Sequence, residues 1–318
     1  MNSTLSGIIG QFDYWRQVAP PAALTDRSAT HIVVGCGTSY NLALSIAAAL
    51  NAAGLRALAV PAGEWVLRPA SYLPTDAKGV QVIALSRSGE TTETLQAARV
   101  SRARGLRVTG ITCALGSALS GASDVALEFA THPAEGVVMT ASASLMLLAG
   151  YALAGHPADD ALAFRAEALA SAMEAVPAEA YAGRSHFVFL GGGSNYGVAL
   201  EGALKLQEMA ISYTQAFHPG EYRHGPVSLV DHRTAIVMLY HPDTARDEAA
   251  LVAELQAKGA WVLGLGGPGD ISLAVGSGAP LCGLEVLPAL QMLGECHAVA
   301  HGIDTTAPRH LTKVVVLE

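Results

Sequence analysis

The chain of 318 residues contains an internal repeat, and this repeat limits its possible folds more than any other feature. Three segments of the first half recur in the second half, in the same order and at an offset of about 155 residues. The pairs are residues 31–39 with 186–194, 62–65 with 219–222, and 103–110 with 257–264. Two copies of one unit explain the length better than two unrelated domains.

Within the first copy, short apolar runs rich in strand-forming residues alternate with helical stretches. The expected strands cover residues 31–34, 55–60, 80–85 and 106–112, and the expected helices cover residues 41–53 and 92–103. This alternation predicts a parallel sheet flanked by helices, so the fold class is α/β with two tandem units. We divide the chain into a helical lead-in (1–27), a first domain (28–158), a second domain (159–302) and a C-terminal tail (303–318).

Composition excludes some classes of function. Half of the residues are hydrophobic, only 14% are charged, and the net charge of -8 comes with no basic patch, which argues against nucleic acid as a partner.

The four cysteines lie far apart, so we expect them to be reduced, and we expect no metal and no cofactor. Residues 136–158 contain no Asp, Glu, Lys or Arg and are long enough to span a membrane, yet their Ser, Thr, Gly and Ala content favours a buried helix over a membrane span. With no signal peptide at the N-terminus, we expect a cytoplasmic protein without a membrane partner.

The stretch from Ser86 to Thr94 follows an apolar strand and opens a helix. Hydroxyl groups and backbone N–H groups at such a helix start, near the positive end of its dipole, make a phosphate cradle. An ordinary turn rich in capping residues is the alternative. Thr38 and Ser39 offer hydroxyls at the preceding glycine turn, whereas the second copy has His-Pro-Asp at residues 241–243 in place of the cradle.

The second copy carries candidate proton-transfer groups instead. Glu201, Lys205 and Glu208 are spaced i, i+4 and i+7, so they share one face of a predicted helix. If exposed, they form an ordinary surface ion pair; if buried, desolvation and the lysine act in opposite directions on a carboxyl pKa, which suits proton transfer. His224 follows in a loop framed by Gly and Pro and is an acid/base candidate. Lys313 precedes an expected terminal strand at residues 314–317, and the residues alone do not single it out.

Five motifs together resemble the double sugar isomerase (SIS) domain family, which includes the isomerase domain of glucosamine-6-phosphate synthase and its stand-alone relatives. The resemblance covers nearly the whole chain from about residue 28. The motifs are residues 35–39 (GCGTS), 85–91 (LSRSGET), 199–205 (ALEGALK), 223–226 (RHGP) and 308–313 (PRHLTK).

The resemblance implies roles for the candidate residues. The sugar phosphate would be bound by Thr38, Ser39, Ser86, Arg87, Ser88 and Thr91. Glu208 would move a proton between C1 and C2, and Lys313 would form a Schiff base with the open-chain ketose. Glu201 and Lys205 would support these groups. His224 would assist ring opening from a neighbouring subunit, which implies a homodimer.

Departures from the synthase pattern shape the expected reaction. Residue 2 is Asn rather than a nucleophilic cysteine, and we expect no glutaminase activity. Arg87 replaces the usual glutamine, and residues 136–142 are closer to those of stand-alone deaminases, isomerases and deglycases. The resulting hypothesis is an aminosugar 6-phosphate isomerase/deaminase that makes fructose 6-phosphate and ammonia from glucosamine 6-phosphate. A fructosamine-6-phosphate deglycase and a non-catalytic sugar-phosphate-binding regulator are the alternatives; the motifs select no particular hexosamine or epimer.

Overall fold

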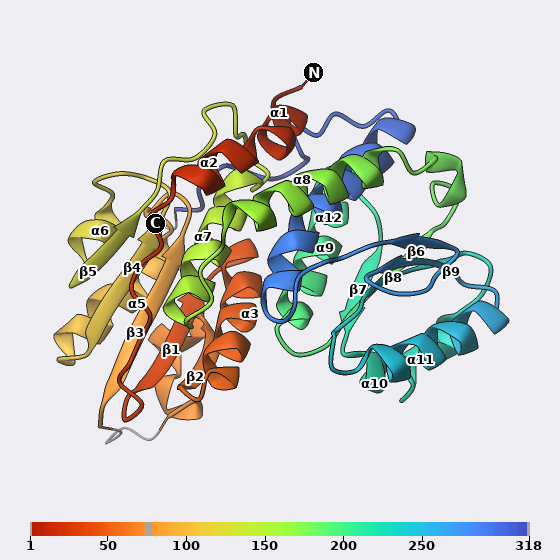
Figure 1. Ribbon diagram of the computed structural model, residues 1–318. Helices are drawn as coiled ribbons and strands as arrows, with labels where there is room; N and C mark the ends of the chain where they lie inside the picture. Colours follow the sequence, from red (N-terminus) through yellow and green to blue (C-terminus); the bar gives the residue numbers. More distant parts are fainter. Residues whose placement is uncertain (1, 74–77, 317–318) are drawn as a thin grey trace.

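The computed structural model describes residues 2–73 and 78–316 and contains two five-stranded parallel sheets (Figure 1). The first sheet is built from β1 (Thr30–Gly35), β2 (Arg56–Pro61), β3 (Val80–Ser86), β4 (Arg107–Thr112) and β5 (Val125–Glu128). The second is built from β6 (His186–Gly191), β7 (Thr214–Phe217), β8 (Thr234–Leu239), β9 (Trp261–Leu265) and β10 (Ile271–Leu273).

The two sheets have the same strand order, which confirms the duplication. The orders are β2-β1-β3-β4-β5 and, in reverse, β7-β6-β8-β9-β10. Both are the flavodoxin-like order, in which the chain changes direction across the sheet between the first and third strands. Each strand that the first copy led us to expect is present within one or two residues of its predicted bounds.

Twelve helices of the described chain cover these sheets. Those of the first half are α1 (Ser3–Ile9), α2 (Gln11–Gln17), α3 (Thr38–Ala52), α4 (Ala62–Leu67), α5 (Thr92–Ala103), α6 (Ala118–Gly121) and α7 (Ala141–Leu153). Those of the second are α8 (Asp160–Glu174), α9 (Asn195–Ala210), α10 (Pro219–Tyr222), α11 (Ala245–Ala257) and α12 (Leu281–Ala300). Figure 1 shows α3, α7, α9 and α12 between the two sheets, and one hydrophobic core spans this layer.

Helix α7 fulfils the prediction of a buried helix. All 13 of its residues are buried, because α3, α2 and α12 pack around it. Among the residues that the structure describes, no helix is both long and apolar enough to cross a membrane. The absence of charge in this segment therefore reflects packing inside the protein.

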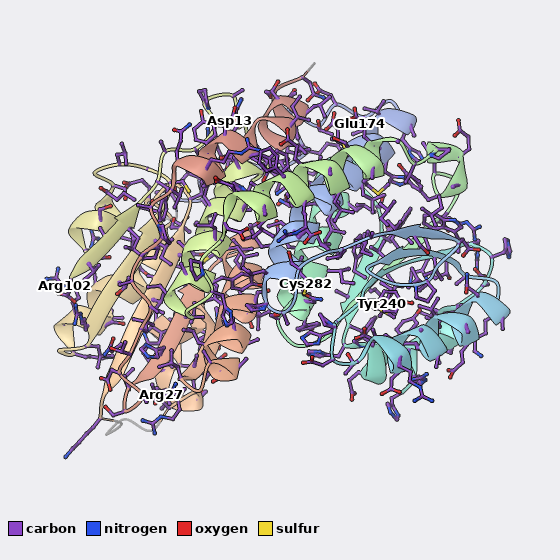
Figure 2. All side chains as sticks on the ribbon, in the orientation of Figure 1. Asp13, Arg27, Arg102, Glu174, Tyr240 and Cys282 are labelled. Atoms are coloured by element: carbon purple, nitrogen blue, oxygen red, sulfur yellow. The ribbon has the colours of Figure 1, made fainter. Side chains whose placement is uncertain are left out.

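Side chains fill the space between the copies (Figure 2). Cys282, labelled there, lies at the start of α12 and donates from Sγ to Asn195 Oδ1 of α9 at 3.4 Å. Where α9 crosses α3, a Cβ on Gly197 would lie 2.2 Å from the backbone oxygen of Asn41, so the two helices touch through a glycine. The four cysteines are all free, as predicted.

The expected terminal strand is wrong for the residues described. Residues 314–316 have no strand conformation, and Leu317 lies outside the described residues. The tail instead crosses back to the first copy, where the Val315 carbonyl accepts a hydrogen bond from the Thr92 N–H at 3.4 Å. An apolar run of valines is typical of strands, but here the Val315 carbonyl meets the first residue of α5 rather than a sheet edge.

Candidate active site

A pocket lies at the carboxyl ends of β1 and β3, where the sequence predicted the phosphate cradle. The glycine turn after β1 leads into α3, and the loop of residues 86–91 leads from β3 into α5. Both turns open on one edge because β1 and β3 are neighbours. The pocket has a volume of about 200 Å³ and is lined by Cys36, Gly37, Ser39, Arg87, Ser88, Thr91, Glu93, Met139, Lys313 and Val315.

The loop after β3 holds its own shape through short-range hydrogen bonds. The Gly89 N–H donates to Ser86 Oγ at 3.1 Å, and Ser86 Oγ donates to Thr91 Oγ1 at 3.3 Å. Gly89 has a φ of 66°, and a Cβ there would lie 2.1 Å from Ser117 Oγ. Only glycine therefore fits this turn, which delivers the chain to the N-terminus of α5.

The predicted phosphate ligands fall into two groups. Ser39, Arg87, Ser88 and Thr91 line the pocket, whereas Thr38 and Ser86 do not. The Thr38 hydroxyl faces the neighbouring helix α9, and the Ser86 hydroxyl serves the loop itself. A role in phosphate binding stays a prediction for all six residues.

The polar row of α9 is buried, so it is not a surface ion pair. Both Glu201 and Lys205 have side chains that are 0% exposed. Lys205 Nζ lies 3.2 Å from Glu201 Oε1 and 2.5 Å from Glu208 Oε2. Glu201 also accepts hydrogen bonds from Thr38 Oγ1 at 2.9 Å and from Asn41 Nδ2 at 3.0 Å. Helix α3 of the first copy therefore fixes the row on α9 of the second.

Burial and charge act against one another in this row. Burial raises the pKa of Glu201, although Lys205 opposes the shift. Burial alone would lower the pKa of Lys205, but the charges of Glu201 and Glu208 and their hydrogen bonds outweigh it, so the pKa of the lysine is raised. Lys205 thus stays protonated at neutral pH and serves two carboxylates. The side chain of Glu208 is 20% exposed, which makes it the member of the row that a ligand can reach.

Arg87 and Lys313 join the phosphate loop to the tail. Arg87 Nη1 donates to the carbonyls of Gly136 at 3.1 Å and Val137 at 2.9 Å, and Nη2 donates to the carbonyl of Lys313 at 2.6 Å. Lys313 Nζ in turn donates to the carbonyl of Glu135 at 2.8 Å. The predicted Schiff-base lysine therefore lies at the pocket that holds the phosphate loop.

A second pocket, of about 260 Å³, is lined by Glu208 and neighbouring residues of α9 and by tail residues 309–311. Two of its residues, Ile211 (φ 52°) and His310 (φ 62°), are the non-glycine residues with positive φ in the described chain. Such backbone conformations cost on the order of 1 kcal/mol or more and concentrate at functional sites. The tail therefore contributes to both pockets, with Lys313 in one and His310 in the other.

His224 lies apart from these groups. It is exposed, in the turn that follows α10, and is not among the residues that line the two pockets. The sequence reasoning missed Asn41 and Glu135, which support Glu201 and Lys313. Asn41 was within reach of the sequence, because it follows Thr38 by three residues and so shares its helix face. Glu135 had no such signal, since it acts through its backbone carbonyl.

In the second copy, a side chain of the protein itself occupies the turn after β8. The carboxylate of Glu248, in the first turn of α11, accepts hydrogen bonds from the His241 N–H at 2.8 Å and from Thr244 Oγ1 at 2.9 Å. Glu248 is buried, and this burial raises the pKa of its carboxyl group. An internal carboxylate thus occupies the turn after β8 that corresponds to the phosphate loop after β3.

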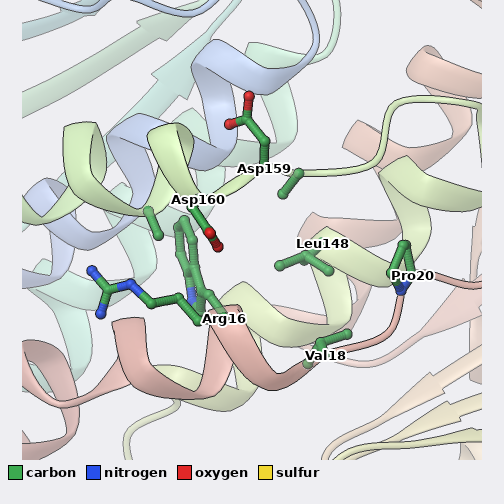
Figure 3. A pocket seen from close by; sticks show the side chains of 9 residues that line it. Arg16, Val18, Pro20, Leu148, Asp159 and Asp160 are labelled. Carbon is green, nitrogen blue, oxygen red and sulfur yellow. The ribbon is translucent and has the colours of Figure 1, made fainter.

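A smaller pocket of about 110 Å³ lies between α2, α7 and α8 (Figure 3). Two of its polar residues have structural roles. Asp159 caps α8 by accepting a hydrogen bond from the Leu162 N–H at 2.8 Å, and Arg16 pairs with Glu167 at 3.0 Å. None of the predicted site residues lines it.

Comparisons with known proteins identify the family of the chain. The family model described as the SIS domain matches residues 24–155 and 181–277. The glutamine–fructose-6-phosphate aminotransferase (isomerizing) of Pyrobaculum aerophilum is 31% identical over 313 residues, which cover 90% of this chain and 51% of that protein. The protein of the same name from Mycolicibacterium smegmatis is 31% identical over 350 residues, which cover 98% of this chain and 55% of the relative. The chain therefore spans about half the length of these relatives.

Two solved structures share the whole architecture. That of glucosamine-6-phosphate deaminase from Thermotoga maritima has a TM-score of 0.86 and 33% identity, and the match covers 99% of this chain and 100% of that one. The C-terminal domain of glucosamine-fructose-6-phosphate aminotransferase from Francisella tularensis has the same fold, with a TM-score of 0.81 and 24% identity over 95% and 97% of the two chains. The predicted resemblance is confirmed: the chain belongs to the SIS domain family.

Proposed function

We propose that the protein converts glucosamine 6-phosphate and water into fructose 6-phosphate and ammonia. The observation that carries this proposal is that one pocket is lined both by hydroxyls of the loop after β3 and by the tail residue Lys313. A phosphate handle and an amine nucleophile at one site suit an open-chain phosphosugar. The relative from Thermotoga maritima, which matches over the full chain, is a glucosamine-6-phosphate deaminase, and this favours deamination.

In the proposed mechanism, the hydroxyls of Ser39, Ser88 and Thr91 bind the 6-phosphate. Glu208 takes the proton from C2 of the open-chain aminosugar and returns it to C1, which leaves an imine at C2. The Lys313 amine adds to this imine and expels ammonia, so that the ketose is held as a Schiff base of Lys313. Water then adds to the Schiff base, the C2–Nζ bond breaks, and fructose 6-phosphate and the free lysine are released. Each step needs one positioned base and a fixed phosphate.

Lys205 and Glu201 support Glu208 in this proposal, because the ammonium of Lys205 orients the Glu208 carboxylate through their 2.5 Å contact. His224 is proposed to assist ring opening in the site of a neighbouring subunit within a homodimer. Its exposed position in the turn that follows α10 supports this assignment.

The test is production of ammonia and fructose 6-phosphate from glucosamine 6-phosphate. Glu208→Gln and Lys313→Ala should each lower kcat by at least about 100-fold, since each removes a group that contacts the reacting carbons. Glu174→Gln and Lys258→Ala, which change exposed residues, are the matched controls. Unchanged turnover in both site variants would overturn the residue assignments. Release of a free amino acid from fructosamine 6-phosphates would indicate a deglycase instead.

A further inference from the structure

The Arg87 side chain has more hydrogen-bond donors than its observed partners use. A guanidinium group carries five N–H donors. Three hydrogen bonds are made, two from Nη1 and one from Nη2, and all three end on backbone carbonyls. Nε and the second Nη2 hydrogen have no partner among the described residues. Arg87 also lines the phosphate pocket, so these two donors belong to a side chain that a bound anion can reach.

The carbonyls that Arg87 binds belong to two separate segments, the loop before α7 and the C-terminal tail. Gly136 and Val137 follow Glu135, whose buried carboxylate accepts hydrogen bonds from the N–H groups of Thr140 at 2.5 Å and Ser142 at 3.1 Å at the start of α7. The segment of residues 135–137 is therefore anchored to the start of the buried helix α7. The third carbonyl is that of Lys313, which lies on an exposed tail.

Few contacts hold the tail in place beside the pocket. Lys313 is bound through its carbonyl to Arg87 and through its ammonium group to the carbonyl of Glu135. Beyond it, the Val315 carbonyl accepts a long hydrogen bond of 3.4 Å from Thr92. During Schiff-base formation the Lys313 amine must leave the Glu135 carbonyl. The hydrogen bond from Arg87 to the Lys313 carbonyl then remains to hold this part of the tail in place.

We propose that Arg87 is a positioning residue that couples phosphate binding to the placement of Lys313. The two unused donors bind the phosphate while the other three hold the tail against residues 136–137, so one guanidinium bridges ligand and tail. Because linkage is reciprocal, phosphate binding stabilises the docked tail to the same degree that the docked tail strengthens phosphate binding. The inference rests on the proposed function only in taking the ligand to carry a phosphoryl group.

Hydrogen exchange of residues 309–316, measured with and without inorganic phosphate, tests this coupling without any turnover. In the wild-type protein phosphate should slow exchange of these tail amides by at least about 10-fold. Arg87→Gln should abolish the effect, and Arg99→Gln, which changes an exposed arginine of α5, should preserve it. Equal protection in wild type and Arg87→Gln would overturn the proposal, as would no protection in the wild type.

Kinetics give a second, independent readout. A lysine at position 87 keeps the charge but has a shorter reach and no planar fork. Arg87→Lys should therefore raise KM for the phosphosugar by less than about 5-fold while lowering kcat by at least about 10-fold. Reductive trapping of Lys313 with fructose 6-phosphate and borohydride should fall in parallel with kcat. A variant that loses only affinity, with trapping intact, would show that Arg87 binds phosphate without placing the tail.

If the protein turns over no aminosugar phosphate, the proposed function fails but the exchange experiment still decides the role of Arg87. The two proposals therefore fail separately.

Discussion

Lys205 shows how a single residue is constrained on both sides. Its ammonium group is fully buried between two carboxylates, and its removal would leave the buried Glu201 without its charge partner and the partly exposed Glu208 without its hydrogen-bond donor. Lys205→Met should therefore lower the free energy of unfolding at neutral pH by about 3 kcal/mol. Urea denaturation measures the change.

A second substitution checks the cause of that loss. Adding Glu201→Gln to Lys205→Met removes one of the two charges and should restore part of the stability. The stability deficit of Lys205→Met relative to wild type should also shrink as the pH falls, because the carboxylates take up protons. A Lys205→Met protein as stable as wild type at neutral pH would contradict this account.

His297 gives a pH dependence of its own. It is buried on α12, packs 4.7 Å from the ring of Phe187, and burial, with a smaller effect of His301, lowers its pKa from 6.5 to about 4. Above pH 6.5 both folded and unfolded states are neutral at this residue, whereas between 6.5 and about 4 only the unfolded state binds the proton. Stability is therefore lost as the pH falls through this window.

His297→Phe should remove this part of the acid sensitivity. The loss of unfolding free energy between about pH 7 and about pH 5 should be about 1–2 kcal/mol smaller in the variant than in wild type. Chemical denaturation at the two pH values measures it. Equal losses in both proteins would show that His297 does not titrate in this way.

Sequence reasoning worked best for the part of the candidate site that lies on a regular element, helix α9. The spacing of Glu201, Lys205 and Glu208 placed them on one helix face, and the structure confirms that they interact. The contacts of Arg87 were beyond reach, since they end on carbonyls of residues 136–137 and 313, which no local pattern brings together. Lys313 was found through the family resemblance rather than from its own surroundings.

At the scale of elements, the contact between α3 and α9 unites the two copies. A Cβ on Gly197 would lie 2.2 Å from the Asn41 backbone oxygen and 2.8 Å from the Ser45 nitrogen, and backbone atoms cannot rotate away. Gly197→Ala should therefore force the helices apart and destabilise the protein by about 2 kcal/mol. It should also lower kcat, because Asn41 holds Glu201.

Gly121→Ala is the matched control. Gly121 ends the short helix α6, and beyond its chain neighbours and its own helix backbone no described heavy atom lies within 4 Å of the position that its Cβ would take. This variant should stay within about 0.5 kcal/mol of wild type, as surface changes usually do. Thermal or urea unfolding compares the two variants, and equal effects would contradict the packing argument.

The regular elements were predictable from periodicity and the tail was not. Strands such as β3 are continuous apolar runs bounded by polar turns, and helix α5 matches its predicted bounds at both ends. Residues 314–316 carry the same strand-forming composition, but the path of the tail places Val315 beside Thr92 at the start of α5 instead of at a sheet edge. Tertiary placement overrode local propensity there.

At the scale of the whole molecule, the proposed homodimer predicts complementation. If His224 enters the site of its neighbour, a mixture of His224→Ala and Lys313→Ala subunits forms heterodimers in which one site carries both changes and the other carries neither. After random exchange of subunits, the mixture should recover about a quarter of wild-type activity. An activity no higher than that of the separate variants would place His224 and Lys313 in the same subunit's site.

The duplicated architecture also sets a stoichiometry. The first copy leaves the turn after β3 open to an outside anion, whereas Glu248 already satisfies the corresponding turn after β8 from within the chain. Although the two halves share one strand order, the chain should therefore bind a phosphosugar in one of them only. Calorimetry with fructose 6-phosphate should give one equivalent bound per chain, with the second half acting as a built-in, permanently occupied copy of the first.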